Sequence, residues 1–564
     1  MEEKILIHFD RGDSSPLEQH EITLGATLLS LVEQLGVGGS KNIIAAYVNN
    51  RVKELDYRLF KSATLRYVDI STFAGVRVYM RSASLLLQCA VEEVLPDYTL
   101  YIRHSMGANG LYCEVEGEDG LVVLNAAQVA LIEQRMRLIV EADEPIECQK
   151  LPTDEVRELY RQRGYDDKVA LLDTRPRLYS EIYRLRNSIG YFYGSLAPRT
   201  SYVSHFELEC YHKGFYMGLP RRDDVTQLSR SPEQRQMYQI FQLHQFWVDI
   251  MGVQTVGALN AKVLSGGSSE MIKLAEALSE RGVASTADEI AAAYFDRGCR
   301  VVLLAGPSSS GKTTTSKRLG IQLQLLGLQP VLISMDDYFV DRECTPRDAS
   351  GEYDFEALEA VDVARFNSDL NRLMAGESLC TPRYDFVTGR SLMHDEPLQL
   401  GERSIIIVEG IHGLNPKLSC QIDQQKIFRI YASCFTVVAM DNASRIASAD
   451  NRLLRRLIRD YATRGASAEA TLKRWASVRR GEERHIFPYQ ENADRMINTS
   501  LFYEIAVLRP YAERILREVP NTGVEFEEAR RLMKLLDHFV VIDSVEIPPT
   551  STLREFIGGG SFTY

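Results

Sequence analysis

The second half of the chain alternates between short apolar runs and stretches in which apolar residues recur at helical spacing. Apolar runs typical of buried parallel strands lie at 301–305, 330–334, 404–408 and 427–432. After the first run, Leu319, Leu323 and Leu326 recur at helical spacing, which predicts a helix over 314–326. Strands that alternate with helices predict an α/β fold with a parallel sheet.

The first 70 residues carry a different pattern. Apolar and polar positions predict strands at Lys4–Phe9, Ile43–Val48 and Thr64–Val68, and a helix at Ala26–Leu35. We therefore expect a small separate unit of strands around one helix.

Residues 71–285 form a second block, in which Arg81–Val91 starts an amphipathic helix and Asn109–Glu114 is a predicted strand. The Gly/Ser segment Ser265–Ser269 then precedes a helical pattern, so we place a domain boundary between about 265 and 290. The predicted domains are residues 1–70, 71–285 and 286–564.

Composition narrows the class of protein. A chain of 564 residues is too long for one core, and 45% hydrophobic with 25% charged residues is typical of soluble globular proteins. The net charge of −12 argues against a general nucleic-acid coat or a binder of anionic membranes. The nine cysteines include no C-x-x-C pair, which argues against a disulfide scaffold and a Cys-rich zinc site. We see no signal-peptide pattern and no apolar stretch long enough for a bilayer, so we expect a cytoplasmic protein.

The segment from Gly306 to Thr313 reads G-P-S-S-S-G-K-T and fits the phosphate-loop pattern G-x-x-x-x-G-K-[ST]. It lies between a predicted strand and a predicted helix, as this motif requires. Backbone N–H groups of such a loop surround phosphates, Lys312 supplies a positive charge, and Thr313 supplies a hydroxyl for Mg²⁺. The predicted nucleotide-binding residues are Gly306, Ser308, Ser309, Ser310, Gly311, Lys312, Thr313 and Thr314.

Two carboxylates follow predicted strands, Asp336 after 330–334 and Glu409 after 404–408. Ligands bind at the carboxyl ends of strands in such sheets, where a carboxylate can accept a hydroxyl proton or help to position Mg²⁺.

An arginine-rich helix is predicted further along the chain, with one face formed by Arg452, Arg455, Arg456 and Arg459. A row of guanidinium groups facing the phosphate loop would neutralise a transferring phosphoryl group. The alternative is a solvated basic face that pairs with nearby acids such as Asp450 and Asp460.

Six motifs in order resemble the uridine kinase and phosphoribulokinase family of P-loop kinases. They are the phosphate loop, D-x-aromatic-aromatic at 336–339, an aromatic-acidic segment at 353–356, Y-D-F at 384–386, E-G-I at 409–411 and R-L-x-R-R-x-x-R-D at 452–460. The resemblance implies a kinase that uses ATP and Mg²⁺ to phosphorylate a hydroxyl of a nucleoside such as uridine or cytidine, or of a related sugar-bearing molecule.

The resemblance also implies roles for individual residues. Asp336, Lys312, Arg456 and Arg459 would be catalytic. The metal would be held by Thr313, Asp336 and Glu409. The acceptor would contact Glu356, with Asp354 as the alternative, and Tyr384 and Arg464. Gly389 and Ala466 stand where uridine kinases carry a histidine and an arginine, so the acceptor stays open and a sugar phosphate is an alternative.

The front half resembles two modules of threonyl-tRNA synthetases. Segments G-A-T-L-L at 25–29 and A-A-Y-V-N at 45–49 resemble the TGS domain, a β-grasp module, and the block after it resembles the second additional domain of threonyl- and alanyl-tRNA synthetases. That family's H-x-x-x-H is replaced by Arg81 and Leu85, which neither ligate a metal nor shuttle a proton at neutral pH. We therefore expect an α+β editing-like domain without editing chemistry.

A rival function follows from these front modules, namely an RNA- or tRNA-associated regulator whose nucleotide site acts as a switch. The acidic net charge and the lack of a guanine-reading [NT]-K-x-D motif argue against it. The sequence leaves open the oligomeric state, the role of the front domains and the role of the charged, aromatic segment 475–489.

Overall fold

The structure is a computed structural model that describes residues 3–12, 15–37, 42–107, 109–230, 233–347, 351 and 353–563. Its first part is a five-stranded sheet with the order β2-β1-β5-β3-β4. The elements are β1 (Lys4–Phe9), β2 (Glu18–Thr23), α1 (Leu31–Gln34), β3 (Ile43–Val48), β4 (Arg51–Lys53) and β5 (Ala63–Asp69). The predicted helix at 26–35 is shorter than expected, because Thr27 pairs with Arg58 in an isolated β-bridge.

The second part contains two antiparallel sheets and the helices that cover them. One sheet has the order β12-β13-β7-β6 with β8 paired to β7, and the other has the order β11-β10-β9. Their strands are β6 (Thr99–Met106), β7 (Gly110–Gly117), β8 (Gly120–Val122), β9 (Glu147–Pro152), β10 (Tyr179–Leu185), β11 (Ser188–Gly190), β12 (Glu207–Tyr211) and β13 (Gly214–Gly218). The helices are α2 (Phe73–Val94), α3 (Ala126–Glu141), α4 (Thr153–Gln162), α5 (Asp166–Asp173), α6 (Arg235–Met251) and α7 (Val256–Leu264).

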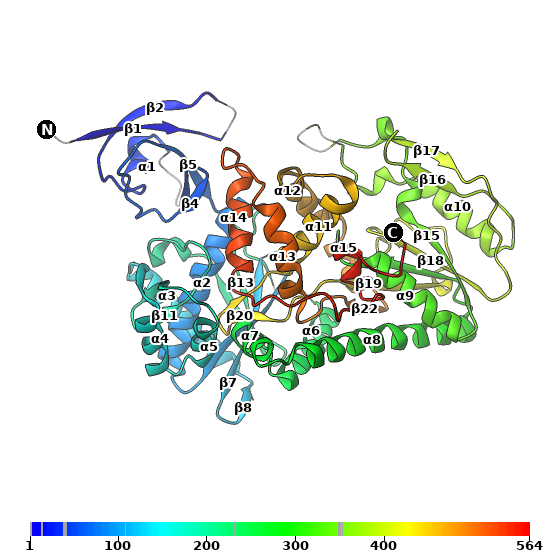
Figure 1. Ribbon diagram of the computed structural model, residues 1–564, viewed down its shortest axis with the longest axis horizontal. Coiled ribbons are helices and arrows are strands. Elements are labelled where there is room, and N and C mark those ends of the chain that lie inside the picture. Colours follow the sequence, from blue (N-terminus) through cyan, green and yellow to red (C-terminus); the bar gives the residue numbers. More distant parts are fainter. Residues whose placement is uncertain are drawn as a thin grey trace.

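A single 30-residue helix, α8 (Ser268–Arg297), runs from the second part to the last sheet (Figure 1). The predicted boundary region therefore lies almost entirely within one continuous helix. Its αL residue at the end, Gly298, has φ of 70° and terminates the helix just before the phosphate-loop strand.

The last part is built on a five-stranded parallel sheet with the order β15-β18-β14-β19-β22. The strands are β14 (Val301–Ala305), β15 (Gln329–Ser334), β18 (Ser404–Gly410), β19 (Ile427–Ser433) and β22 (Arg495–Asn498). The four predicted strands are confirmed, and β22 is one that the short apolar pattern did not reveal. Val301 and Leu303 pack toward α10 (Val363–Met374), whereas Val302 and Leu304 pack toward α8 and α9 (Lys312–Leu325). The predicted α/β architecture thus has helices on both faces of the sheet.

The remaining helices pack between the sheet and the front parts of the molecule (Figure 1). They are α11 (Ser448–Arg464), α12 (Ala468–His485), α13 (Glu504–Leu516), α14 (Glu525–Leu536) and the short α15 (Arg554–Ile557). The C-terminus lies close to α9, since Lys317 of α9 donates a hydrogen bond to the carbonyl of Thr563. In the part of the chain that the structure describes, no helix is long and apolar enough to cross a membrane.

Candidate active site

The phosphate loop connects β14 to α9 and has the geometry that its sequence predicts. Gly311 has φ of 80°, and a Cβ on Gly306 would lie 2.0 Å from the carbonyl oxygen of Ala432, so both positions favour glycine. Ser309 is a non-glycine residue with φ of 57°, an uncommon conformation that occurs at functional sites. The loop is therefore held in a shape that the chain would adopt only under a specific constraint.

Polar groups of this loop are left for a ligand. The Oγ atoms of Ser309 and Ser310 are buried and have no hydrogen-bond partner among the described residues. Lys312 Nζ donates to the carbonyl oxygens of Gly306 and Pro307, at 2.9 and 3.0 Å. Burial lowers the pKa of Lys312, because an ammonium ion is less well solvated there. Buried donors without an acidic partner fit the phosphates of a nucleotide.

The predicted metal residues meet at the carboxyl edge of the sheet. Thr313 Oγ1 donates to both oxygens of Glu409, at 2.9 and 3.1 Å. The strand register explains this meeting, because Glu409 pairs with Leu304 of β14 on one side and with Ser334 of β15 on the other. Burial raises the pKa of Glu409 to about 7, although Lys312 and Thr313 act in the opposite direction.

Asp336 follows β15 in a 3₁₀ turn, Met335–Tyr338, at the same edge of the sheet. Its backbone N–H is capped by Ser334 Oγ at 3.3 Å, which fixes the start of the turn. Among the described residues, the Asp336 carboxylate itself has no hydrogen bond or ion pair. Burial raises its pKa, while the charges of Lys312, Arg464 and Arg459 lower it. The carboxylate is thus in the field of the phosphate-loop lysine and available to a ligand.

The arginine helix α11 contacts the phosphate loop directly. Arg456 Nη1 donates to Ser308 Oγ at 2.7 Å, and Arg452 Nη1 donates to the Ser308 carbonyl at 3.1 Å. Arg459 and Arg464 instead lie against Asp460, at 2.9 and 3.5 Å, and Arg456 also pairs with Asp460 at 3.1 Å. Asp460 therefore gathers Arg456, Arg459 and Arg464 beside the loop. The predicted contact of the arginine face with the phosphate loop and the alternative of pairing with nearby acids are thus both present.

A second layer of acids, which the sequence analysis missed, holds this helix in place. Arg452 forms a buried ion pair with Glu482 of α12, with the two side chains 3% and 0% exposed. Arg455 is fully buried and pairs with Glu504 at 2.5 Å. Arg455 reaches the loop through Thr499, whose Oγ1 donates to the Ser310 carbonyl at 2.5 Å. Arg455 is a positioning residue for the loop, not one that faces the phosphates.

On the acceptor side, the carboxyl groups of Glu356 and Asp354 have different surroundings. Asp354 Oδ1 accepts the N–H of Glu356 in a local turn at 3.1 Å. Burial raises the pKa of Glu356 to about 7; Glu482 raises it further, while Arg456 and Lys312 act against them. The carboxyl group of Glu356 therefore shares the electrostatic environment of the phosphate loop.

Tyr384 lies on β16 (Pro382–Asp385), where its N–H donates to Asp337 Oδ1 at 3.3 Å. Its hydroxyl is buried and has no partner among the described residues. Its ring contacts Phe339 and Phe386, with centroid distances of 5.6 and 5.0 Å. Gly389 ends the turn into β17 (Arg390–Met393) with φ of 72°. This left-handed conformation favours glycine, so the turn itself accounts for the residue at this position.

The segment 475–489 that the sequence left unassigned forms the second half of α12 and the start of the 3₁₀ turn Phe487–Asn492, and it lies against Glu356 at Gly481. A Cβ on Gly481 would lie only 2.5 Å from Glu356 Cβ, so the helix approaches the acceptor side as closely as glycine allows.

The C-terminal helix α15 also reaches the phosphate loop. Glu555 accepts hydrogen bonds from Thr314 Oγ1 at 2.6 Å and from the Thr314 N–H at 3.3 Å. Thr314 lies at the start of α9, where backbone N–H groups of this motif bind phosphates. A carboxylate 241 residues away in sequence thus lies where a nucleotide would bring negative charge.

Comparison with known proteins agrees with both predicted resemblances. Residues 301–504 match the phosphoribulokinase / uridine kinase family. A uridine kinase of Leuconostoc citreum is 28% identical over 178 residues, which cover 32% of this chain and 76% of that protein. The threonine–tRNA ligase of Symbiobacterium thermophilum is 28% identical over 204 residues, which cover 36% of this chain.

The chain spans only 30% of that threonine–tRNA ligase, and 33% of the one from Syntrophotalea carbinolica. Among solved structures, D-glycerate 3-kinase from Cryptococcus neoformans is 14% identical with a TM-score of 0.20, covering 47% of this chain and 89% of that one. The resemblance of the C-terminal region to the kinase family and of the N-terminal region to threonine–tRNA ligases is confirmed.

Proposed function

We propose that this protein is an ATP-dependent kinase that phosphorylates a hydroxyl of a nucleoside. The observation that carries the proposal is the hydrogen-bonded pair Thr313–Glu409 at the phosphate-loop edge of the sheet. Beside it lies the Asp336 carboxylate, which has no hydrogen bond or ion pair among the residues that the structure describes. A hydroxyl and a carboxylate for a metal, next to a free base, are the parts that phosphoryl transfer requires.

The residues present fit Mg²⁺ bound together with ATP. Magnesium is usually held by one or two carboxylates and by substrate phosphates, not by an all-protein cage. Thr313 and Glu409 would hold it, with Asp336 near it, and the bound ion would neutralise charge on the phosphates. Lys312 and the unpartnered serine hydroxyls of the loop would hold the phosphate oxygens.

In the transfer step, the acceptor oxygen forms a bond to the γ-phosphorus while the bond from that phosphorus to the β,γ-bridging oxygen breaks. Asp336 takes the proton of the acceptor hydroxyl, and ADP leaves with the bridging oxygen. Arg456 already donates to the loop, and Arg459, which Asp460 holds beside it, would leave Asp460 to approach the transferring group. These guanidinium groups stabilise the charge of the transition state.

The acceptor is proposed as a nucleoside because the side of the site next to Asp336 combines a carboxyl group with aromatic rings. Glu356 would hydrogen-bond sugar hydroxyls, and the cluster of Phe339, Tyr384 and Phe386 offers ring faces to a base. The match to a uridine kinase supports the same class. A sugar phosphate is the alternative acceptor, since Gly389 and Ala466 replace base-reading residues.

The test is ADP release with ATP and Mg²⁺ across a panel of nucleosides and sugar phosphates. We expect one nucleoside to stimulate release, and Asp336→Asn to reduce that turnover by roughly 10²–10⁴-fold while ATP still binds. Asp395→Asn, at an exposed position in the same domain, is the matched control. Stimulation by no acceptor, or equal turnover in Asp336→Asn and the control, would contradict the proposal.

A further inference from the structure

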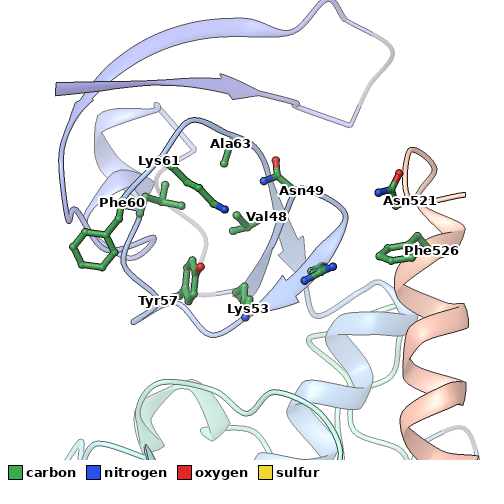
Figure 2. A pocket seen from close by; sticks show the side chains of 11 residues that line it. Val48, Asn49, Lys53, Tyr57, Phe60, Lys61, Ala63, Asn521 and Phe526 are labelled. Atoms are coloured by element: carbon green, nitrogen blue, oxygen red, sulfur yellow. The ribbon is translucent and has the colours of Figure 1, made fainter.

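A pocket of about 380 Å³ lies between the front sheet and the start of α14, remote from the phosphate loop. Its volume falls within the range of about 300–1,000 Å³ in which proteins bind small ligands. Figure 2 shows Tyr57, Lys53 and Lys61 on the side of the front sheet, with Asn521 and Phe526 facing them from the α14 side. The lining includes the cationic residues Arg51, Lys53 and Lys61 and, within the described part of the chain, no carboxylate.

The cations of the pocket stand out by their charge, which nearby acids do not balance in the part of the chain that the structure describes. Among the described residues, none of Arg51, Lys53 and Lys61 forms an ion pair with a carboxylate. Glu54, next to Lys53 in sequence, instead accepts a hydrogen bond from Tyr183 at 2.7 Å. The pocket is therefore a local positive region on a chain whose net charge is −12.

Aromatic rings accompany these charges. Lys53 Nζ lies 4.7 Å from the Tyr57 ring centroid, and the Arg51 guanidinium lies 5.8 Å from that of Phe526. Phe60 is 67% exposed, and within the described part of the chain no cation or second ring lies against it. The apolar surface of an exposed phenylalanine ring gains free energy when a ligand covers it. An exposed ring next to cations is therefore typical of a surface that binds a ligand.

We propose that this pocket binds a phosphorylated nucleoside, either as a free nucleotide or as a nucleotide of a single-stranded RNA. Phe60 stacks against the base, and Lys53, Lys61 and Arg51 neutralise the phosphate. Cations alone would suit any anion, but the free ring face adds a preference for a planar aromatic group. The site is separate from the phosphate loop and does not depend on kinase activity.

The experiment measures the fluorescence anisotropy of labelled AMP and of a labelled short oligouridylate. The protein is the full chain carrying Lys312→Ala, in buffer without Mg²⁺, so that the phosphate loop contributes little to binding. Phe60→Ala is expected to weaken binding at least about fivefold. Lys53→Ala with Lys61→Ala is expected to reduce the salt dependence of RNA binding by roughly 1.4 in log–log slope.

The control is Lys150→Ala, which removes a lysine that lies 5.6 Å from the ring of Tyr179 in the same kind of pair but outside the pocket. Thermal unfolding midpoints equal to that control exclude misfolding of the variants. Binding of AMP alone identifies a free nucleotide as the ligand, and binding of RNA alone identifies a strand, and either result supports the site.

Three results would overturn the inference. One is no binding of either probe, and another is equal affinity in Phe60→Ala and Lys150→Ala. The third is displacement of the probes by oligoglutamate as readily as by unlabelled nucleotide, which would show that the pocket attracts negative charge without recognising a base.

Discussion

Replacing Glu482 by glutamine tests whether α12 holds the phosphate loop in its binding shape. Glu482 forms two contacts with the guanidinium of Arg452, one of them at 2.7 Å, and both side chains are buried. Arg452 in turn donates to the carbonyl of Ser308 in the loop. Glutamine keeps the shape of the side chain but removes its charge, so Arg452 becomes an unpaired buried cation.

The expected magnitude follows from this burial. Removing one partner of a buried ion pair destabilises a protein by about 3–5 kcal/mol, because the remaining charge stays out of water. Arg452 keeps the Ser308 carbonyl at 3.1 Å and lies 5.4 Å from the Trp475 ring centroid. We therefore expect the low end, about 3 kcal/mol, which lowers the unfolding midpoint by roughly 6–12 °C for a domain of this size.

The assay combines thermal unfolding with ATP binding by calorimetry. A chain with several cores need not unfold in one step, so the midpoint to compare is that of the transition that ATP shifts. ATP affinity is expected to fall about tenfold or more, because Ser308 loses its fixed position. Glu483→Gln removes a more exposed charge that pairs with Arg222 and is expected to lower the stability by no more than about 1 kcal/mol.

A double variant separates stability from loop positioning. Arg452→Met with Glu482→Leu removes both buried charges, so the unfolding midpoint should return close to that of the unaltered protein while ATP binding stays weak. Equal midpoints and equal ATP affinities for Glu482→Gln and Glu483→Gln would refute the reasoning. Full ATP affinity in the double variant would show that the loop does not need Arg452.

Three further predictions concern the same site. Gly481→Ala should raise the KM for the acceptor and destabilise the protein by roughly 1–3 kcal/mol, because the new methyl group would lie 2.5 Å from Glu356 Cβ; steady-state kinetics and thermal unfolding measure both effects. Below pH 7, the dissociation constant of Mg²⁺ in the presence of ATP should rise about tenfold per pH unit, because Glu409 has a raised pKa of about 7 and must lose its proton to bind the metal; calorimetry across pH measures this. Glu555→Gln should tighten ATP binding about fivefold, because it removes a carboxylate next to Thr314 that would repel the ATP phosphates. Equilibrium binding measures the change.

Each of these predictions has a matched control. Gly282→Ala places a methyl group on α8 where nothing lies within 4 Å, so it should stabilise the protein, and equal losses in the two glycine variants would count against the clash. For the pH series, the same titration of ATP in solution gives the proton linkage of the nucleotide alone, and an identical slope would exclude Glu409. Glu546→Gln, at an exposed position, should leave ATP affinity unchanged, and the prediction fails if Glu555→Gln does the same.

The parts of the site that are local in sequence could be predicted from it. The phosphate loop needs only a strand, its glycines and a helix, and Asp336 and Glu409 each directly follow an apolar run. Parallel strands place their carboxyl ends at one edge, so the meeting of Thr313 with Glu409, 96 residues apart, follows from the fold class.

The contacts that support the site could not be predicted because they join distant segments. Glu482 binds Arg452, 30 residues away, and Glu555 binds Thr314, 241 residues away. No sequence pattern in either segment indicates which residue will be the partner. The sequence predicts Glu356 as the acceptor contact, with Asp354, two residues earlier, as the alternative. The turn uses the shorter side chain of Asp354 to cap its own backbone, whereas the charges of Arg456 and Lys312 act on the Glu356 carboxyl group.

A chain of ion pairs, buried at its Arg531–Asp450 end, links the front of the molecule to the arginine helix. Arg531 of α14 binds Asp450, in the first turn of α11, through two contacts of 2.7 Å, and it also binds Glu528 at 2.7 Å. Glu528 accepts a further bond from Arg77 of α2 at 2.8 Å. The order α2, α14, α11 therefore joins the synthetase-like part to the helix that holds the phosphate loop.

The lowered pKa of Glu528 indicates how much its ion pairs with Arg531 and Arg77 stabilise the folded state. Burial alone would raise its pKa, but Arg531 and Arg77 outweigh burial and lower the pKa from 4.5 to about 2. A lowered carboxyl pKa contributes stability that is present above pH 4.5 and is lost as the pH falls toward 2. The difference corresponds to roughly 3 kcal/mol at neutral pH. Phe526 of the proposed nucleotide pocket lies two residues before Glu528, so the pocket adjoins the first turn of α14, where this chain of ion pairs passes from α2 to Arg531.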